Sequence, residues 1–200
     1  MNMTMRNSIN HHNIFPLVLA IALFMQSLDI TIVTAAIPAM ASTFNTSTID
    51  LKTCLTSYLV SMFFFTPISG WLADRFGSKK IFSISLIIFI IGSLLCGISN
   101  SLHQLIASRI VQGTGGSLMM PVGRLILFRS FEKHDLIKIS NYVTTPALMG
   151  PLLGPAIGGA IVSIAAWKWI FFINIPFGII AFILSLAFLN EDKTSFSKTF

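Results

Sequence analysis

The sequence has very few charged side chains. Asp, Glu, Lys and Arg make up only 10% of its 200 residues, against about 25% in soluble globular proteins. Hydrophobic residues make up 54%, and the mean hydropathy is +0.82. So few charges cannot cover a water-soluble protein of this size, which excludes a soluble globular domain. The net charge of +6 has no specific meaning when so few charges are exposed, and we expect no nucleic-acid partner.

The sequence also lacks the residue groupings of disulfide-rich proteins, metal sites and enzymes. Its two cysteines, Cys54 and Cys96, lie in apolar runs and suggest no disulfide framework. No nucleophile–base set, metal-ligand cluster or Gly-Lys phosphate loop is present. The neighbouring His11 and His12 stand alone and are expected to be inert. We therefore expect neither an enzyme nor a bound metal.

Long apolar runs are what the sequence has instead. Each run is near or above the length that a helix needs to cross about 30 Å of hydrocarbon. The runs predict an all-α integral membrane protein with six spanning helices in one domain, residues 14–190. The predicted helices are about 14–40, 51–73, 79–99, 103–129, 138–165 and 168–190.

Basic residues mark one side of the predicted bundle. With the N-terminus inside, the outer segments hold only Lys52 and Lys168. The inner segments then hold Arg6, Arg75, Lys79, Lys80, Arg129, Lys133, Lys138, Lys193 and Lys198. Because short cytoplasmic loops carry an excess of Lys and Arg, this bias predicts a multi-pass protein in a lipid bilayer. Both tails, 1–13 and 191–200, are expected to be cytoplasmic.

Three charges lie within the apolar runs, away from the outermost residues of the predicted helices. A charge costs roughly 2.5–3.5 kcal/mol at the membrane centre. Asp29 is about 22 Å from the inner start of its helix and Arg109 about 9 Å from the outer start of the fourth, so they lie at similar depth. We expect them to pair directly or through water. Their pairing fits either a titratable carboxylate tuned by an arginine or a structural ion pair that locks two helices. Arg124 lies near the inner end, where it is expected to reach the lipid interface.

The fourth helix has a polar and small-residue face. At 100° per residue, Gln112, Gly113 and Gly116 share this face with Arg109. The pattern suits the wall of a water-filled cavity. The alternative is close helix packing through the glycines, and the two can coexist along one helix.

The fifth helix has glycines at four-residue spacing, Gly150, Gly154 and Gly158, with Pro151 and Pro155 between them. Such a row allows close backbone approach, and prolines permit kinks. The pattern indicates either tight packing alone, or a bend or closed seam that limits leakage during conformational change.

The loop between the second and third helices has its own pattern. Gly77 permits a tight reversal, and Asp74 and Arg75 are placed to form ion pairs between moving parts. The alternative is topological, with Arg75, Lys79 and Lys80 only retaining the loop inside.

Five blocks together carry a family resemblance, and they run in order along residues 15–190. They are Leu28–Val33 followed by Ala36-Ile37-Pro38, Gly70–Lys80, Arg109 with Gln112, Gly113, Gly115 and Gly116, Gly150–Gly159, and Trp167–Pro176. The chain resembles the amino-terminal half of a major facilitator superfamily transporter, and most closely the bacterial drug:proton antiporters of the fourteen-span branch. Departures are Thr34, where the branch usually has Asn, and Ser78, where Arg is common.

The resemblance implies a role for each block. It implies that Asp29 and Arg109 take part in proton coupling, with the proton gradient as energy source and no cofactor. The loop motif would hold the cytoplasmic gate; its residues are Gly70, Asp74, Arg75, Gly77, Lys79 and Lys80. The fifth-helix motif would mark export in exchange for protons; its residues are Gly150, Gly154, Pro155, Gly158 and Gly159. The implied location is the bacterial inner membrane.

The resemblance also implies two inverted three-helix repeats and a second six-helix half, with a small amphipathic substrate between the halves. We expect the chain to be a truncated product, a fragment of a longer gene, or a subunit that assembles with another half. The function implied is proton-coupled efflux of drug-like compounds. The alternative is an inactive remnant, or a non-transporting protein that associates with a full transporter.

Overall fold

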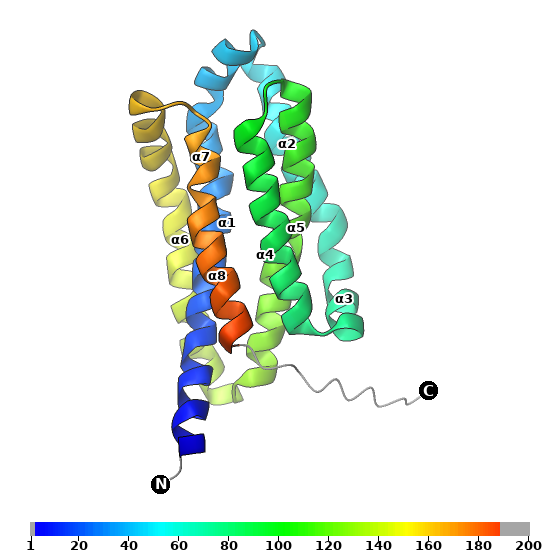
Figure 1. Cartoon of the computed structure of the whole chain (residues 1–200), viewed down its shortest axis with the longest axis vertical. Helices are drawn as coiled ribbons and strands as arrows, with labels where there is room; N and C mark the ends of the chain where they lie inside the picture. Colours follow the sequence, from blue (N-terminus) through cyan, green and yellow to red (C-terminus); the bar gives the residue numbers. More distant parts are fainter. Residues whose placement is uncertain (1–2, 189–200) are drawn as a thin grey trace.

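A computed structural model describes the backbone from Met3 to Phe188 and the side chains from Ile14 to Ala187. Its elements are α1 (Met3–Phe44), α2 (Thr48–Phe65), the 3-10 turn η1 (Thr66–Ile68), α3 (Ser69–Phe76), α4 (Ser78–Ile98), α5 (Leu102–Ser130), α6 (Lys133–Ile164), α7 (Trp169–Phe172) and α8 (Asn174–Phe188). With α2, η1 and α3 forming one rod and α7 with α8 another, these make six rods side by side (Figure 1). This confirms the all-α, six-helix prediction. The expected tail 191–200 lies outside the described residues.

Five of the six rods are long and apolar enough to cross a membrane: residues Ile14–Phe44, Thr48–Phe76, Ser78–Ile98, Lys133–Ile164 and Trp169–Ala187. The remaining rod, α5, has the length but carries Arg109, Gln112 and Arg124 within its sequence. Its polarity is tolerated because its neighbours surround it. α5 packs against α4, α2, α1 and α3, and Arg109 and Gln112 are fully buried.

The packing pairs repeat across the bundle. In a division into two three-helix units, α1 and α5 are the first helices and α4 and α8 the third. The first helix of each unit packs against the second of the other: α1 against α6, and α5 against α2. The third helix of each unit packs against the first of the other: α4 against α5, and α8 against α1. α1 starts at the lower end in Figure 1, whereas α5 starts at the upper end. This pairing is the one that two three-helix units of opposite direction would make, and it agrees with the inverted repeats that the resemblance implies.

Local sequence signals set the helix ends. Ser47 begins α2 and its hydroxyl accepts a hydrogen bond from the Asp50 amide at 3.1 Å. Ser101 begins α5 in the same way, accepting from the Gln104 amide at 3.3 Å. Such side-chain caps satisfy amides that have no partner within the helix. Gly77, with φ at 91°, turns the chain between α3 and α4 in a conformation that side chains rarely adopt.

Two spans expected to be continuous are interrupted. The expected helix 51–73 consists of α2, η1 and α3, because Pro67 cannot continue the hydrogen-bond ladder of α2. The expected helix 168–190 is divided at Ile173 into α7 and α8. The second interruption lies beside the buried polar cluster described below.

The buried core is divided into two apolar clusters. One contains Leu19, Met25, Tyr58 and Phe89; the other contains Ile32, Met40, Cys54 and Phe171. Along α1 the boundary falls between Met25 and Ile32, where Asp29 lies. A layer of buried polar side chains therefore separates two apolar layers.

Candidate functional site

An ion pair between α1 and α5 forms the centre of this polar layer. Arg109 Nη1 lies 2.7 Å from Asp29 Oδ2, and both side chains are 0% exposed. Of the two arrangements expected from the sequence, direct or water-mediated, the structure has the direct one. A buried charge is tolerated only when it is paired and hydrogen-bonded. Asp29 and Arg109 Nη1 meet both conditions, whereas Arg109 Nε and Nη2 are buried without a hydrogen-bond partner among the described residues.

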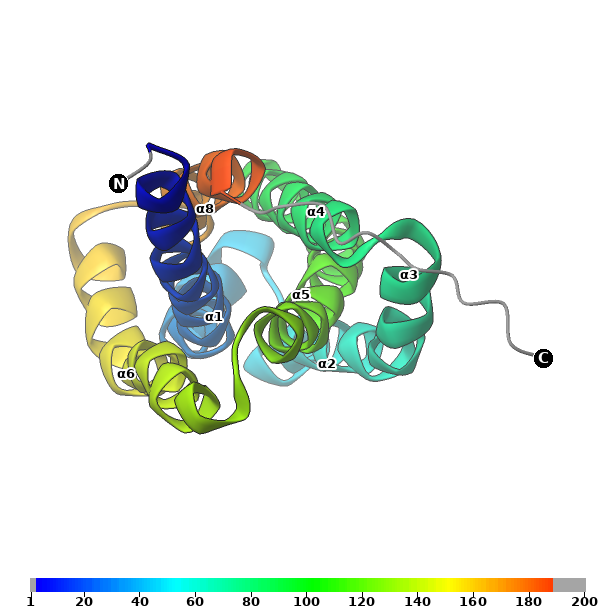
Figure 2. The same ribbon diagram turned by 90° about the horizontal axis from the view of Figure 1, so that it is seen from below.

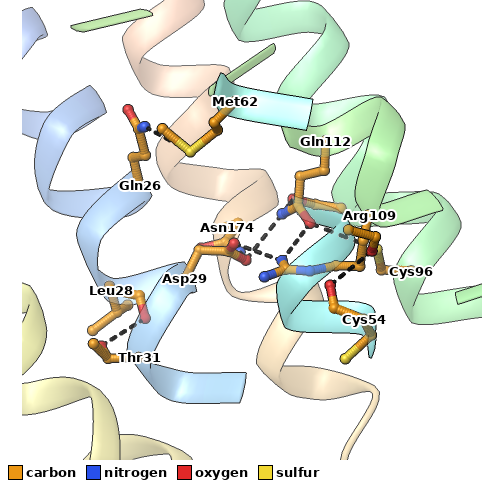
Figure 3. Close-up of polar contacts among 12 residues, drawn as sticks. Gln26, Leu28, Asp29, Thr31, Cys54, Met62, Cys96, Arg109, Gln112 and Asn174 are labelled. Atoms are coloured by element: carbon orange, nitrogen blue, oxygen red, sulfur yellow. Dashed lines mark hydrogen bonds and ion pairs between the residues drawn. The ribbon is translucent and has the colours of Figure 1, made fainter. Parts of the chain in front are cut away.

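Two amides complete the shell around the carboxylate (Figure 3). Gln112 Nε2 donates to Asp29 Oδ1 at 2.9 Å, and Asn174 Nδ2 donates to the same oxygen at 2.7 Å. Gln112 also accepts from Arg109 Nη1 at 2.7 Å and donates to Ser93 Oγ at 2.8 Å. The cluster thus joins α1, α4, α5 and the start of α8.

Aromatic rings surround the guanidinium group. Arg109 Cζ lies 4.3 Å from the centroid of the Tyr58 ring and 5.7 Å from that of Phe171. A cation over an aromatic face is attracted by the ring quadrupole, and more strongly when it is desolvated. α2 and α7 therefore also contact the charge, so that the ion pair with its Gln112 and Asn174 partners touches five of the six rods.

Of the two charged groups in this pair, only the Asp29 carboxyl can exchange a proton. Asp29 can take up or release a proton, whereas Arg109 remains charged at all relevant pH values. Protonation of Asp29 would leave the arginine buried without its counter-charge, which is far less favourable than the intact pair. The charge of this one carboxylate is therefore held by side chains of several helices.

The polar face of the fourth predicted helix is packed, not open. Gln112, Gly113 and Gly116 are all buried. A Cβ atom on Gly113 would lie 2.7 Å from the Tyr58 carbonyl oxygen, and one on Gly116 would lie 2.8 Å from the Tyr58 hydroxyl. In this structure the two glycines therefore lie in close packing against α2, and the role of this face as a cavity wall stays a prediction.

The glycine row of α6 forms a close seam with α1. A Cβ on Gly150 or Gly154 would collide with Ser27 or Thr31, and a Cβ on Gly158 would lie 2.7 Å from the Ile32 carbonyl oxygen. Two hydroxyls cross the seam: Ser27 donates to the Ala147 carbonyl at 2.7 Å and Thr31 to the Gly150 carbonyl at 3.2 Å. The seam is built on backbone contact.

The other two residues of that motif lie away from the seam. Pro155 and Gly159 are exposed, and a Cβ on Gly159 would meet nothing within 4 Å. α6 remains one helix through Pro146, Pro151 and Pro155. The prolines therefore do not break it, and the seam is the part of the motif that the structure explains.

The loop motif lies at the lower end of the bundle. Asp74 accepts a hydrogen bond from Arg129 Nη2 at 2.7 Å, an ion pair between α3 and α5 in which the two side chains are 64% and 37% exposed. Arg75 is not part of this pair; its guanidinium lies over the Trp71 ring at 5.1 Å. Gly70 has open space around its Cα.

Asn174 is the functional candidate that the sequence analysis did not single out. It lies 145 positions from Asp29 in sequence, and an amide near the start of an apolar helix has many other uses. The available signal was its place within the Trp167–Pro176 block, followed two residues later by Pro176. Ser93 and Tyr58 gave no such signal.

Comparison with known proteins gives a consistent result. The family model described as Major Facilitator Superfamily matches residues 19–199. A relative from Pectobacterium carotovorum, named "Putative multidrug resistance protein MdtD", is 43% identical over 183 residues, which are 92% of this chain and 39% of that protein. A protein of the same name from Salmonella paratyphi B is 44% identical over 163 residues, 82% of this chain and 35% of its own length. The chain thus spans under two fifths of these relatives.

Solved structures share the fold at low identity. The proton:xylose symporter XylE superposes with a TM-score of 0.80 at 15% identity, covering 91% of this chain and 45% of that one. A bacterial homologue of the human lysosomal transporter Spinster gives 0.72 at 18% identity, with 89% and 42% coverage. The apolar helices and the family match make the chain a membrane protein, and it belongs to the major facilitator superfamily.

Proposed function

We propose that the chain forms one half of a transporter that exports small amphipathic, drug-like molecules in exchange for protons. The observation that carries this proposal is the buried Asp29–Arg109 pair within a membrane-spanning bundle. Intramembrane ionisable residues mark proton relays and ion pathways. The relatives named for multidrug resistance support the substrate class.

The proposed coupling step follows from the geometry of the pair. When Asp29 takes up a proton, Arg109 loses its counter-charge while still desolvated against Tyr58 and Phe171. A conformation that hydrates or re-pairs the arginine then becomes favoured. Because the pair contacts α1, α2, α5, α7 and α8, and reaches α4 through Gln112, such a change would move several helices against one another.

The proposed gate lies at the lower end. Asp74 and Arg129 join α3 to α5 there, and Gly77 allows the reversal that brings α3 against α4. An exposed pair contributes only about 0.2–1 kcal/mol. It is therefore weak enough to open and reform during each transport cycle.

We also propose a second six-helix half and a cytoplasmic location for the lower end. Two spans are little buried within the bundle. Only 22% of the most apolar 18-residue stretch is buried in the span formed by α2 and α3, and only 17% in α6. These two spans lie at opposite ends of the cross-section (Figure 2). Both could pack against a second half. The lower end carries Arg75, Lys79, Lys80, Arg129, Lys133 and Lys138, against Lys52 and Lys168 above, which supports an inward orientation in the bacterial inner membrane.

The test is proton-driven efflux by the complete transporter carrying Asp29→Asn, measured in inverted membrane vesicles as drug movement and as accompanying proton flux. Asn keeps the size and can still accept from Arg109, but it cannot titrate. We expect coupled transport to fall at least a hundredfold, because no proton can be taken up at this site. Asp50→Asn, at the exposed start of α2, is the matched control and should transport normally. Undiminished coupled transport by Asp29→Asn would refute the role of this carboxyl.

A further inference from the structure

A pocket of about 560 Å³ lies at the lower end of the bundle between α4 and α8. Its rim carries three cations, Arg75, Lys79 and Lys80. Its apolar lining is Ile84, Ile87, Phe182 and Leu186, of which Ile84, Ile87 and Phe182 lie further from the lower ends of α4 and α8. The lower ends of α4 and α8 lie side by side (Figure 1), and we call this space the α4–α8 pocket.

The three cations have no acidic partner among the described residues. The nearest acid in sequence, Asp74, is engaged by Arg129 on α5. Lys79 Nζ donates to the Leu186 carbonyl at 3.3 Å, which fixes the ammonium between the two walls and leaves its other two hydrogens available. Arg75 lies against Trp71 and Phe76, which orients its guanidinium plane without neutralising it. The rim is therefore a concentrated positive site.

The apolar walls continue from this rim into the hydrocarbon depth. Lys80, Ile84 and Ile87 follow one face of α4, and at 1.5 Å per residue Ile87 lies about 10 Å beyond Lys80 along the helix. Ile84 and Ile87 are 37% and 38% exposed within a membrane-spanning helix. Trp71 and Phe76, which are 54% and 47% exposed, lie at the same end, where aromatic side chains mark the headgroup level.

From this combination we infer that the α4–α8 pocket binds an anionic phospholipid, with the phosphate at Lys79, Lys80 and Arg75 and an acyl chain along Ile84, Ile87 and Phe182. A soluble anion would match the rim but leave the apolar walls unused. A neutral lipid would match the walls but not the three cations. Basic pockets between membrane helices are suited to anionic headgroups. The bound lipid would bridge α4 and α8, the third helices of the two repeats.

The test measures lipid retained by the purified full-length protein in neutral detergent, by native mass spectrometry during titration with phosphatidylglycerol or phosphatidylcholine. We expect one phosphatidylglycerol to bind at least tenfold more tightly than phosphatidylcholine. Lys79→Gln with Lys80→Gln should lower this affinity about tenfold. Lys133→Gln with Lys138→Gln removes the same charge from exposed positions of α6 and should change it less than twofold.

A second variant tests the pocket without changing the charge. Ile87→Trp places a larger apolar side chain in the wall and should lower phosphatidylglycerol binding at least threefold, because it fills the space for the acyl chain. The inference is overturned if the two lysine pairs have equal effects, which would indicate general attraction, or if Ile87→Trp binds normally. It is also overturned if millimolar inorganic phosphate displaces the lipid, since the site would then be one for a free anion.

Discussion

Two ion pairs in this molecule have the same length and opposite surroundings. Asp29–Arg109 and Asp74–Arg129 both measure 2.7 Å, yet the first has both side chains fully buried and the second has them 37% and 64% exposed. Each joins α5 to a helix of the first repeat. The distance alone therefore does not determine how much each ion pair contributes to the free energy of folding.

The surroundings decide the energy. Removing one partner of a buried pair costs about 3–5 kcal/mol, because the other charge is left uncompensated in a low dielectric. An exposed pair is screened by water and contributes about 0.2–1 kcal/mol. The buried pair is suited to transmit the binding of a proton, and the exposed pair is suited to a contact that breaks readily.

The largest expected effect comes from removing one charge of the buried pair. Arg109→Gln should lower the free energy of unfolding by about 3–5 kcal/mol, measured by thermal and denaturant unfolding in detergent. The reason is that Asp29 would remain buried with only Gln112 and Asn174 as donors. Arg124→Gln, on the same helix but exposed, is the control and should change little.

A double variant separates charge from contact. Asp29→Asn with Arg109→Gln removes both charges together, and we expect it to recover most of the lost stability while remaining unable to couple transport to protons. If the double variant is as unstable as Arg109→Gln alone, an uncompensated Asp29 charge is not the cause, and the contrast between the two pairs fails.

The buried pair was predictable from the sequence, and its other partners were not. Charges within apolar runs are rare, so Asp29 and Arg109 were conspicuous, and the helix directions gave their common depth. An amide such as Asn174 is not conspicuous in this way. Helical spacing put Gln112, Gly113 and Gly116 on one face, but spacing cannot say whether water or α2 lies against that face.

The helix breaks show the same limit. Pro67 ends α2, whereas Pro146, Pro151 and Pro155 lie within an unbroken α6. Neighbouring helices and side-chain hydroxyls decide whether freed backbone groups are satisfied inside a membrane protein. A proline in an apolar run therefore predicts a possible break, and tertiary packing determines the outcome.

An intermediate effect is expected for Asn174→Ala. The change removes one of three donors to the Asp29 carboxylate and leaves the ion pair in place, so it should cost about 1–3 kcal/mol of unfolding free energy. In the complete transporter, coupled transport should fall severalfold, less than for Asp29→Asn, because Asn174 positions the Asp29 carboxyl without itself carrying the proton. Asn141→Ala on the exposed side of α6 is the control. A loss of stability with unchanged coupled transport would reduce Asn174 to a structural role.

The smallest effect on stability is expected at the exposed pair, where function and stability should separate. Asp74→Asn should change the free energy of unfolding by less than about 1 kcal/mol, yet lower the transport rate severalfold, because the contact between α3 and α5 would no longer hold one conformation. Exchanging the charges, with Asp74→Arg and Arg129→Asp, should restore much of the rate if the attraction between these positions is what matters.

The same exchange at Asp29 and Arg109 should restore nothing, since the amides of Gln112 and Asn174 are arranged to donate to a carboxylate on α1. Equal rescue at both pairs would mean that burial does not distinguish them, whereas rescue only at the exposed pair would assign the lower contact to gating and the buried one to proton binding.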